Sequence, residues 1–273
     1  MFLPIVCATV LMPQADYRLV WSDEFSTPGT PDLAQWTPES GFVRNREAQW
    51  YRLENARVEE GNLVIEGRRE RVENPNFSDA SDADWKRSRR FAEFTSASLV
   101  TKQTWRFGRF EMRAKIDIRP GLWPAFWTVG RAREWPSGGE IDIMEYYRGN
   151  LLANAAWGTE KRWSAKWDSS STPVAEIARR DGLESAEAWA DKFHVWRMDW
   201  DEKEIRLYVD EHLLNTIDLT KTVNTSQDGA NPFHEPHCIM VNLAIGGDNG
   251  GDPSTTEFPS RYLIDYVRVY QTA

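Results

Sequence analysis

The sequence has few of the residues that build disulfide frameworks and metal centres. Its 273 residues include two cysteines and four histidines, and their spacing matches no zinc motif. If an N-terminal leader containing Cys7 is removed, Cys238 is the only cysteine left, so we expect it to be a buried, inert thiol. The chain also lacks an excess of positive charge: 42 Asp and Glu against 33 Lys and Arg give a formal net charge of −9, which argues against binding to a nucleic-acid backbone.

The chain also lacks an apolar run long enough to span a membrane. Residues 2–12 are almost wholly apolar but too short for a transmembrane helix. With the small residues at 7–9, they predict a signal peptide over residues 1–15, cleaved after Ala15, and hence a secreted, periplasmic or extracellular protein. An ordinary N-terminal strand is the alternative interpretation.

Short β-rich runs, separated by Gly, Pro, Asn and Asp, cover most of the remaining chain. Apolar and polar residues alternate most clearly at 110–116 and 264–270, as in strands that bury one face. So many short strands predict an all-β fold, a jelly-roll sandwich of two antiparallel sheets. No repeat or low-complexity linker divides the chain, so we expect residues 16–273 to form a single, monomeric domain.

Two polar stretches, 69–90 and 160–191, are longer than typical connections between strands. Loops of that length are often functional. Within the second stretch, Ser185 is expected to cap a short helix at 185–191 from which Trp189 packs inward.

Three carboxylates lie close together in the hexapeptide Glu-Ile-Asp-Ile-Met-Glu at 140–145. Its alternation predicts a half-buried strand with Glu140 and Asp142 on one face and Glu145 on the other. A β-bulge of one extra residue would return Glu145 to the face of Glu140. Like charges that close push pKa values apart, so one carboxyl can donate a proton while another is ionised. The alternative, a solvated acidic face on an edge strand, is less favoured because Glu and Asp are poor strand formers.

Clustered carboxylates in a chain with 14 tryptophans point to the hydrolysis of glycosidic bonds. That reaction needs one carboxylic acid to protonate the leaving oxygen and a second carboxylate to attack the anomeric carbon or to activate water. Strand geometry separates the backbones of Glu140 and Glu145 by roughly 13 Å, so spacing alone leaves both the retaining and the inverting arrangement open.

The hexapeptide resembles the active-site strand of family 16 of the glycoside hydrolases, which contains laminarinases, lichenases, agarases and porphyranases. The extra Met144 is similar to the bulged strand of laminarinase-like and agarase-like members. Other segments resemble the family, in its own order, across residues 17–271: 19–25, 107–113, 121–127, 193–196, 242–247 and 265–270. The resemblance implies a concanavalin-like sandwich with its substrate cleft on the concave face.

The resemblance also implies roles for the three acids. Glu140 would be the nucleophile and Glu145 the general acid/base, while Asp142 would hydrogen-bond to the nucleophile and tune the pair. The family retains anomeric configuration through a covalent glycosyl-enzyme intermediate, without a cofactor. The implied activity is endo-acting hydrolysis of a β-linked polysaccharide, with an endo-1,3-β-glucanase favoured.

Four residues are candidates for binding the polysaccharide. Trp123 and Trp127 resemble tryptophans on which sugars stack, and the alternative for each is a core residue. Trp157 resembles a residue that faces the cleft from the neighbouring strand. Asn45 resembles an asparagine that lines the donor subsites, with an ordinary turn residue as the alternative.

A structural calcium ion is the one metal that the resemblance implies, on the far side of the sandwich. Asp265 resembles its carboxylate ligand, and backbone oxygens near Glu24 and Gly61 would complete the set. Calcium prefers oxygen ligands of this kind.

Two departures from the laminarinase pattern leave room for another sugar. Laminarinases commonly have His where this chain has Ala156, and Trp in the loop that here reads Gly-Gly-Asp-Asn-Gly-Gly-Asp at 246–252. An endo-β-galactanase acting on agar, porphyran or host O-glycans is therefore the alternative enzyme. A non-catalytic lectin on the same sandwich, and a transglycosylase in which a sugar hydroxyl replaces water, also stay open.

Overall fold

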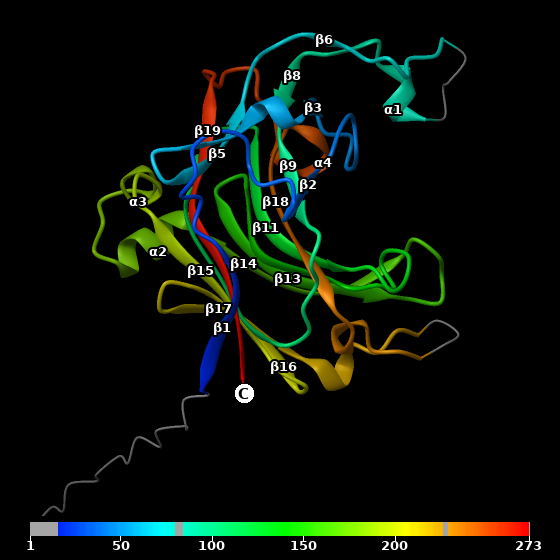
Figure 1. Ribbon diagram of the computed structural model, residues 1–273, viewed down its shortest axis with the longest axis vertical. Helices are drawn as coiled ribbons and strands as arrows, with labels where there is room; N and C mark the ends of the chain where they lie inside the picture. The colour runs from blue at the N-terminus through cyan, green and yellow to red at the C-terminus, as the bar shows by residue number, and fades with distance from the viewer. Residues whose placement is uncertain (1–15, 80–83, 226–228, 273) are drawn as a thin grey trace, which may run out of the picture.

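The computed structural model describes residues 16–79, 84–225 and 229–272, which form two large antiparallel sheets packed face to face (Figure 1). The predicted signal segment at 1–15 lies outside the described residues. The first sheet has eight strands, and β1 (Tyr17–Asp23) pairs with its member β19. The other seven follow the order β17 (His212–Asp218), β16 (Glu204–Val209), β15 (His194–Trp200), β10 (Gly108–Lys115), β19 (Ser260–Thr272), β5 (Asn62–Gly67) and β4 (Ala56–Glu59).

The second sheet carries the acidic hexapeptide. Its seven strands follow the order β14 (Ala165–Pro173), β13 (Asn150–Gly158), β12 (Glu140–Tyr147), β11 (Leu122–Gly130), β18 (His237–Ile245), β9 (Ser98–Thr101) and β2 (Trp36–Pro38). Two small sheets pair β3 (Gln49–Tyr51) with β8 (Phe94–Ser96) and β6 (Val72–Glu73) with β7 (Phe91–Ala92). The predicted all-β sandwich is confirmed, and Cys238 on β18 is buried as expected.

Helices are short and lie outside the two sheets (Figure 1). They are α1 (Trp85–Ser88), α2 (Val174–Arg180), α3 (Ala186–Ala190) and α4 (Gly247–Gly250), with single 3₁₀ turns at η1 (Leu53–Asn55), η2 (Leu219–Lys221) and η3 (Pro232–His234). The Ser185 cap is confirmed, since its Oγ accepts from the Ala188 N–H at 3.1 Å, and Trp189 is buried. In the described part of the chain, no helix is long and apolar enough to cross a membrane.

The polar stretch 160–191 is not the long loop that the sequence predicted. It contains the edge strand β14 followed by α2 and α3. The stretch 69–90 is closer to the expectation, because its described residues, 69–79 and 84–90, contain only the short elements β6 and α1.

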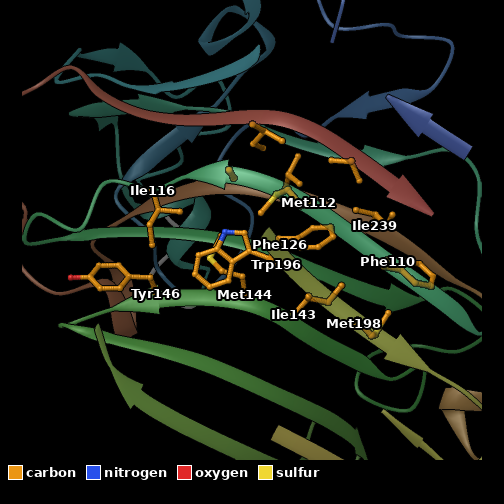
Figure 2. Packing of buried hydrophobic residues seen from close by; sticks show 14 of the residues in the cluster. Phe110, Met112, Ile116, Phe126, Ile143, Met144, Tyr146, Trp196, Met198 and Ile239 are labelled. Atoms are coloured by element: carbon orange, nitrogen blue, oxygen red, sulfur yellow. The ribbon is translucent and has the colours of Figure 1, made fainter. Parts of the chain in front are cut away.

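A hydrophobic core fills the space between the two large sheets. β10 alternates as predicted, with Phe110, Met112 and Ala114 buried. Phe126 from β11 and Trp196 from β15 belong to the same cluster (Figure 2). Because these side chains occupy the inner faces, the alternate residues of the seven-stranded sheet are left on its outer face.

Candidate active site

β12 lies in the middle of the seven-stranded sheet, between β11 and β13. Its pairing with β13 is regular except between Asp142 and Glu145, where Ile143 and Met144 together oppose the single residue Ala153. Ile143 and Met144 are both buried in the core (Figure 2). The predicted bulge is therefore present, and it returns Glu145 to the outer face, which the other two acids share.

Two indole groups hold the two glutamates. Nε1 of Trp135, in the loop before β12, donates to Oε2 of Glu140 at 2.9 Å. Nε1 of Trp123, on β11, donates to Oε1 of Glu145 at 2.6 Å. Hydrogen bonds of this kind favour the ionised carboxylate, and each one acts on a different acid.

Asp142 lies between the two glutamates and is 5% exposed. Its Oδ2 accepts a hydrogen bond from Nδ2 of Asn154 on β13 at 3.3 Å. The hydrogen bond that we expected between Asp142 and Glu140 is not among the contacts of the described residues, and the two groups instead interact through their charges. The two glutamates thus act on Asp142 through their charges.

Burial raises the pKa of all three acids. It brings the pKa of Glu140 to about 7, against the opposing effects of the indole hydrogen bond and of the Arg44 guanidinium. It brings the pKa of Glu145 to about 8, against its own indole bond and reinforced by the charge of Glu140. The pKa of Asp142 lies well above its usual range, because burial and the charges of both glutamates disfavour its ionised form. Both glutamates therefore hold their protons to a higher pH than an exposed carboxyl does.

Trp127 and Trp123 lie on the same face as the acids but in different surroundings. Trp127 is partly exposed beside Asp142, its paired residue on β12, and the Arg44 guanidinium lies 5.2 Å from the centre of its ring. Its Nε1 is held by Oδ1 of Asn242 at 2.7 Å. Trp127 is thus positioned as an accessible platform, whereas Trp123 is only 4% exposed and serves to hold Glu145.

The expected placement of Trp157 at the cleft is wrong. Ala156 is the residue that pairs with Glu140, so the next side chain along β13 points to the opposite face. Trp157 is buried in the core and meets Phe233 edge to face, with ring centres 6.5 Å apart.

Asn45 lies in a turn, at a φ of 52°, rather than in a strand. Its Nδ2 donates to Oε1 of Glu47 at 3.4 Å. Glu47 is buried, and its charge contributes to the raised pKa of Glu145. Asn45 is exposed, so a substrate contact stays a prediction. Asn45 affects the acids only indirectly: it hydrogen-bonds to Glu47, and the charge of Glu47 acts on Glu145.

The residues of the predicted calcium site lie on the eight-stranded sheet and its edge. Oδ2 of Asp265 on β19 accepts from Arg113 at 2.6 Å, and Gly61 lies in the turn between β4 and β5. The Glu24 carboxylate forms two hydrogen bonds with Arg268, at 2.9 and 2.7 Å, which leaves its backbone oxygen as the predicted ligand. Within 16–79, 84–225 and 229–272, no cluster of three or more metal-binding side chains occurs. A calcium ion held by Asp265 and backbone oxygens stays a prediction.

Three residues close to the acids were not predicted from the sequence: Trp135, Asn154 and Trp167. Trp135 precedes β12 in the turn Trp-Pro-Ser-Gly-Gly, and its closeness to Glu140 in the sequence could have indicated that it contacts the acids. Trp167 on β14 pairs with Ala156 and is 45% exposed, which puts it in one row with Glu140 across three strands.

Comparisons with known proteins bear on what this arrangement does. The model of the glycosyl hydrolases family 16 matches residues 72–268. The β-glucanase of Rhodothermus marinus is 36% identical, over 93% of this chain and 85% of its own. The catalytic domain of an endo-1,3-β-glucanase (laminarinase) from Thermotoga petrophila has a TM-score of 0.75 at 31% identity, over 95% of this chain and 99% of its own.

One further solved structure is similar over nearly the whole chain. It comes from work on endo-acting O-glycanases that prominent members of the human gut microbiota express to initiate mucin breakdown. Its TM-score is 0.81 at 33% identity, over 96% of this chain and 92% of its own.

Proposed function

Because the chain belongs to family 16 of the glycosyl hydrolases, it is a glycoside hydrolase, and we propose that it cuts internal β-glycosidic bonds of a polysaccharide with retention of configuration. The observation that carries the mechanism is that the bulge places Glu140 and Glu145 on one face of the sheet, each held by the N–H of a different indole group. Burial raises the pKa of both carboxyls, to about 7 for Glu140 and about 8 for Glu145, so near neutral pH one can be a carboxylate nucleophile while the other holds the proton of a general acid.

The reaction then takes two steps. In the first, a carboxylate oxygen of Glu140 attacks the anomeric carbon while Glu145 gives its proton to the glycosidic oxygen, so the C–O bond breaks and the leaving sugar departs as an alcohol. In the second, Glu145 takes a proton from water as the water oxygen attacks the same carbon, which releases Glu140 as a carboxylate. Asp142, whose pKa is raised by burial and by both glutamates, lies between them, and Trp127 offers the sugar an aromatic face.

The rest of the chain would serve this one activity. We take residues 16–273 as a single catalytic domain and residues 1–15 as the leader that exports it, so the enzyme would meet its polysaccharide outside the cell. No step of the mechanism needs a metal or a cofactor, because the two glutamates supply both the nucleophile and the proton.

1,3-β-Glucan is the leading substrate. Support comes from the similarity to the Rhodothermus marinus β-glucanase and to the Thermotoga petrophila laminarinase domain. Both relatives are matched over most of their length. The bulged strand does not decide between the substrates, because it resembles that of both laminarinase-like and agarase-like members.

A galactose-containing polymer is the second candidate, and two observations favour it. The structure from work on O-glycanases has the higher TM-score of the two solved structures, 0.81 against 0.75. Ala156, fully buried beside Glu140, leaves a methyl group where laminarinases commonly place an imidazole. The loss of that polar group changes what a sugar hydroxyl can bind next to the nucleophile.

A panel of polysaccharides tests the proposal. Laminarin, lichenan, agarose, porphyran and mucin O-glycans would be incubated with the enzyme, and product sizes followed over time with and without acceptor oligosaccharides. Endo-action gives mid-sized products early, and transglycosylation gives products longer than the acceptor. Degradation of laminarin above the others supports the leading substrate, and preference for agarose, porphyran or mucin glycans supports the second.

The variant Glu140→Gln distinguishes an enzyme from a non-catalytic lectin. Turnover should fall by roughly 10⁴-fold while polysaccharide binding persists. Glu111→Gln is the matched control, because Glu111 is a partly buried glutamate on β10 of the other sheet whose pKa burial also raises. A wild-type protein that binds but cleaves none of the panel would count against the proposal.

A further inference from the structure

The edge strand β14 extends the outer face of the catalytic sheet beyond β13. Trp167 pairs with Ala156, which in turn pairs with Glu140, and residues paired across antiparallel strands project to the same face. The neighbouring side chain confirms the direction: Asp168 accepts a hydrogen bond at 3.1 Å from Asn215 of β17, in the other sheet. Trp167 therefore lies on the face of the acids, about 10 Å from Glu140 at two strand spacings.

A second exposed tryptophan lies at the end of β14 next to a cavity. Trp163, in the hairpin that joins β13 to β14, is 55% exposed and has a left-handed φ of 62°. It lines a cavity of about 730 Å³ between this hairpin and the loop before β12. Trp135 lines the same cavity and donates to Glu140. The cavity is thus next to the nucleophile's own hydrogen-bond partner.

These two tryptophans stand out from the rest of the described surface. Within the described ranges, seven large hydrophobic side chains are exposed, and Trp163 and Trp167 are the aromatic ones among them. An exposed large apolar surface beside a functional site is more informative than a scattered exposed leucine. The flat apolar face of a pyranose ring can stack on an indole while the hydroxyl groups at the edge of the ring stay in contact with water.

We propose that Trp163 and Trp167 form a remote subsite that binds pyranose rings of the polysaccharide on the Ala156 side of Glu140. The inference rests on the proposed glycosidase function. It adds where the bound polysaccharide runs and how far it extends beyond the acids. Ala156 lies between Glu140 and Trp167 in this row and is fully buried, so its small side chain does not project into the path of the polysaccharide from the acids to the edge strand. The hydroxyls of Ser169 and Ser171, which alternate with inward residues on β14, continue the same face.

The test compares substrates of increasing length. Trp167→Ala and Trp163→Ala would be assayed on laminari-oligosaccharides from the shortest that is cleaved to the longest available, or on the matching series from whichever polysaccharide the wild type prefers. Leu213→Ala is the control, because Leu213 is equally exposed but lies on β17 of the other sheet. The measured quantity is the ratio of kcat/KM for the longest over the shortest substrate.

Each tryptophan variant should lower this ratio about 3- to 10-fold, mainly through a higher KM for the long substrate, while Leu213→Ala keeps the wild-type ratio. A variant that loses activity equally on all lengths, or that keeps the wild-type ratio, overturns the subsite. A wild type that cleaves no member of any series instead overturns the proposed function, so the two failures are distinguishable. Binding of Glu140→Gln to long oligosaccharides, measured by calorimetry with and without Trp167→Ala, gives the same answer without turnover.

Discussion

The indole N–H of Trp123 lies 2.6 Å from Oε1 of Glu145, and it opposes the burial that raises the pKa of this carboxyl. Trp135 has the same relationship with Oε2 of Glu140 at 2.9 Å. Each acid therefore has its own indole donor, and its pKa can be changed by altering a residue that is not itself an acid.

The wild-type pH profile should be a narrow bell. kcat/KM needs Glu140 ionised and Glu145 protonated, and their pKa values are about 7 and about 8. Activity should rise through the first value and fall through the second. Measurement of kcat/KM from pH 4 to 10 on a soluble oligosaccharide checks this, and a plateau extending below pH 5 would contradict the raised pKa of Glu140.

Trp123→Phe should move the alkaline limb of that bell upward by about one pH unit. Loss of the N–H removes a hydrogen bond that favours the ionised carboxylate, so the pKa of Glu145 rises. The acidic limb should stay in place, because Glu140 keeps its bond from Trp135. Trp127→Phe is the matched control: its N–H goes to Asn242, so neither limb should move. An unchanged alkaline limb in Trp123→Phe would assign that limb to another group.

Glu145→Ala should slow the release of poor leaving groups most. Without a proton donor, an aryl glycoside whose phenol is a good leaving group still departs as an anion, but a sugar alcohol does not. The loss in kcat/KM should therefore be at least about 100-fold larger for the poor leaving group. Equal losses across a series of substituted aryl glycosides would count against the acid role.

Asp142→Asn should stabilise the fold at high pH and not at low pH. The pKa of Asp142 is raised in the folded protein above its unfolded value of about 3.9, so the folded state binds the proton more tightly. The resulting stability is fully present below pH 4 and is lost as pH rises toward the folded pKa. Asn does not titrate, so the melting temperature of the variant relative to wild type should rise by roughly 3–5 °C between pH 4 and pH 8.

Asp218→Asn gives the opposite sign as a control. Hydrogen bonds from Thr220 and Lys221 lower the pKa of Asp218 to about 2, so this carboxylate contributes stability above its unfolded pKa. The Asn variant should therefore lose stability relative to wild type as pH rises from about 2 to about 4, and the difference should then stay constant up to pH 8. The same trend in both variants would show that the effect of Asp142→Asn does not come from its raised pKa.

The sandwich and the catalytic strand could be predicted because their signals are local. Alternation at 110–116 identified β10, and the hexapeptide at 140–145 contained both its acids and the extra residue of its bulge. β14 has no such signal: Lys-Trp-Asp-Ser-Ser-Ser-Thr at 166–172 is polar on both faces, because the strand is at a sheet edge with its outer face in solvent. Trp167 was missed with it.

Trp157 was expected at the cleft from its resemblance to a family residue, and the register of β12 shows why it lies in the core instead. The two-residue turn at 148–149, with both φ values positive, pairs Tyr147 with Asn150. Counting back from that pair without interruption would place Trp157 opposite Glu140. The bulge consumes one residue of β12, so the partner becomes Ala156 and the tryptophan moves to the core face. The facing of β13 residues opposite Glu140 to Asp142 therefore depends on the bulge in β12.

The bulge also gives the catalytic strand a place where its length can change during evolution. Ile143 and Met144 oppose one residue, so deletion of either would leave a regular strand in which Glu140 still pairs with Ala156 and Glu145 with Leu152. Such a deletion would remove one residue from the backbone between the two glutamates, but because both keep their partners on β13, neither their spacing along the sheet nor their facing would change. An insertion or deletion at this position therefore leaves the acids in place, whereas a one-residue change elsewhere in β12 would reverse the facing of one of them.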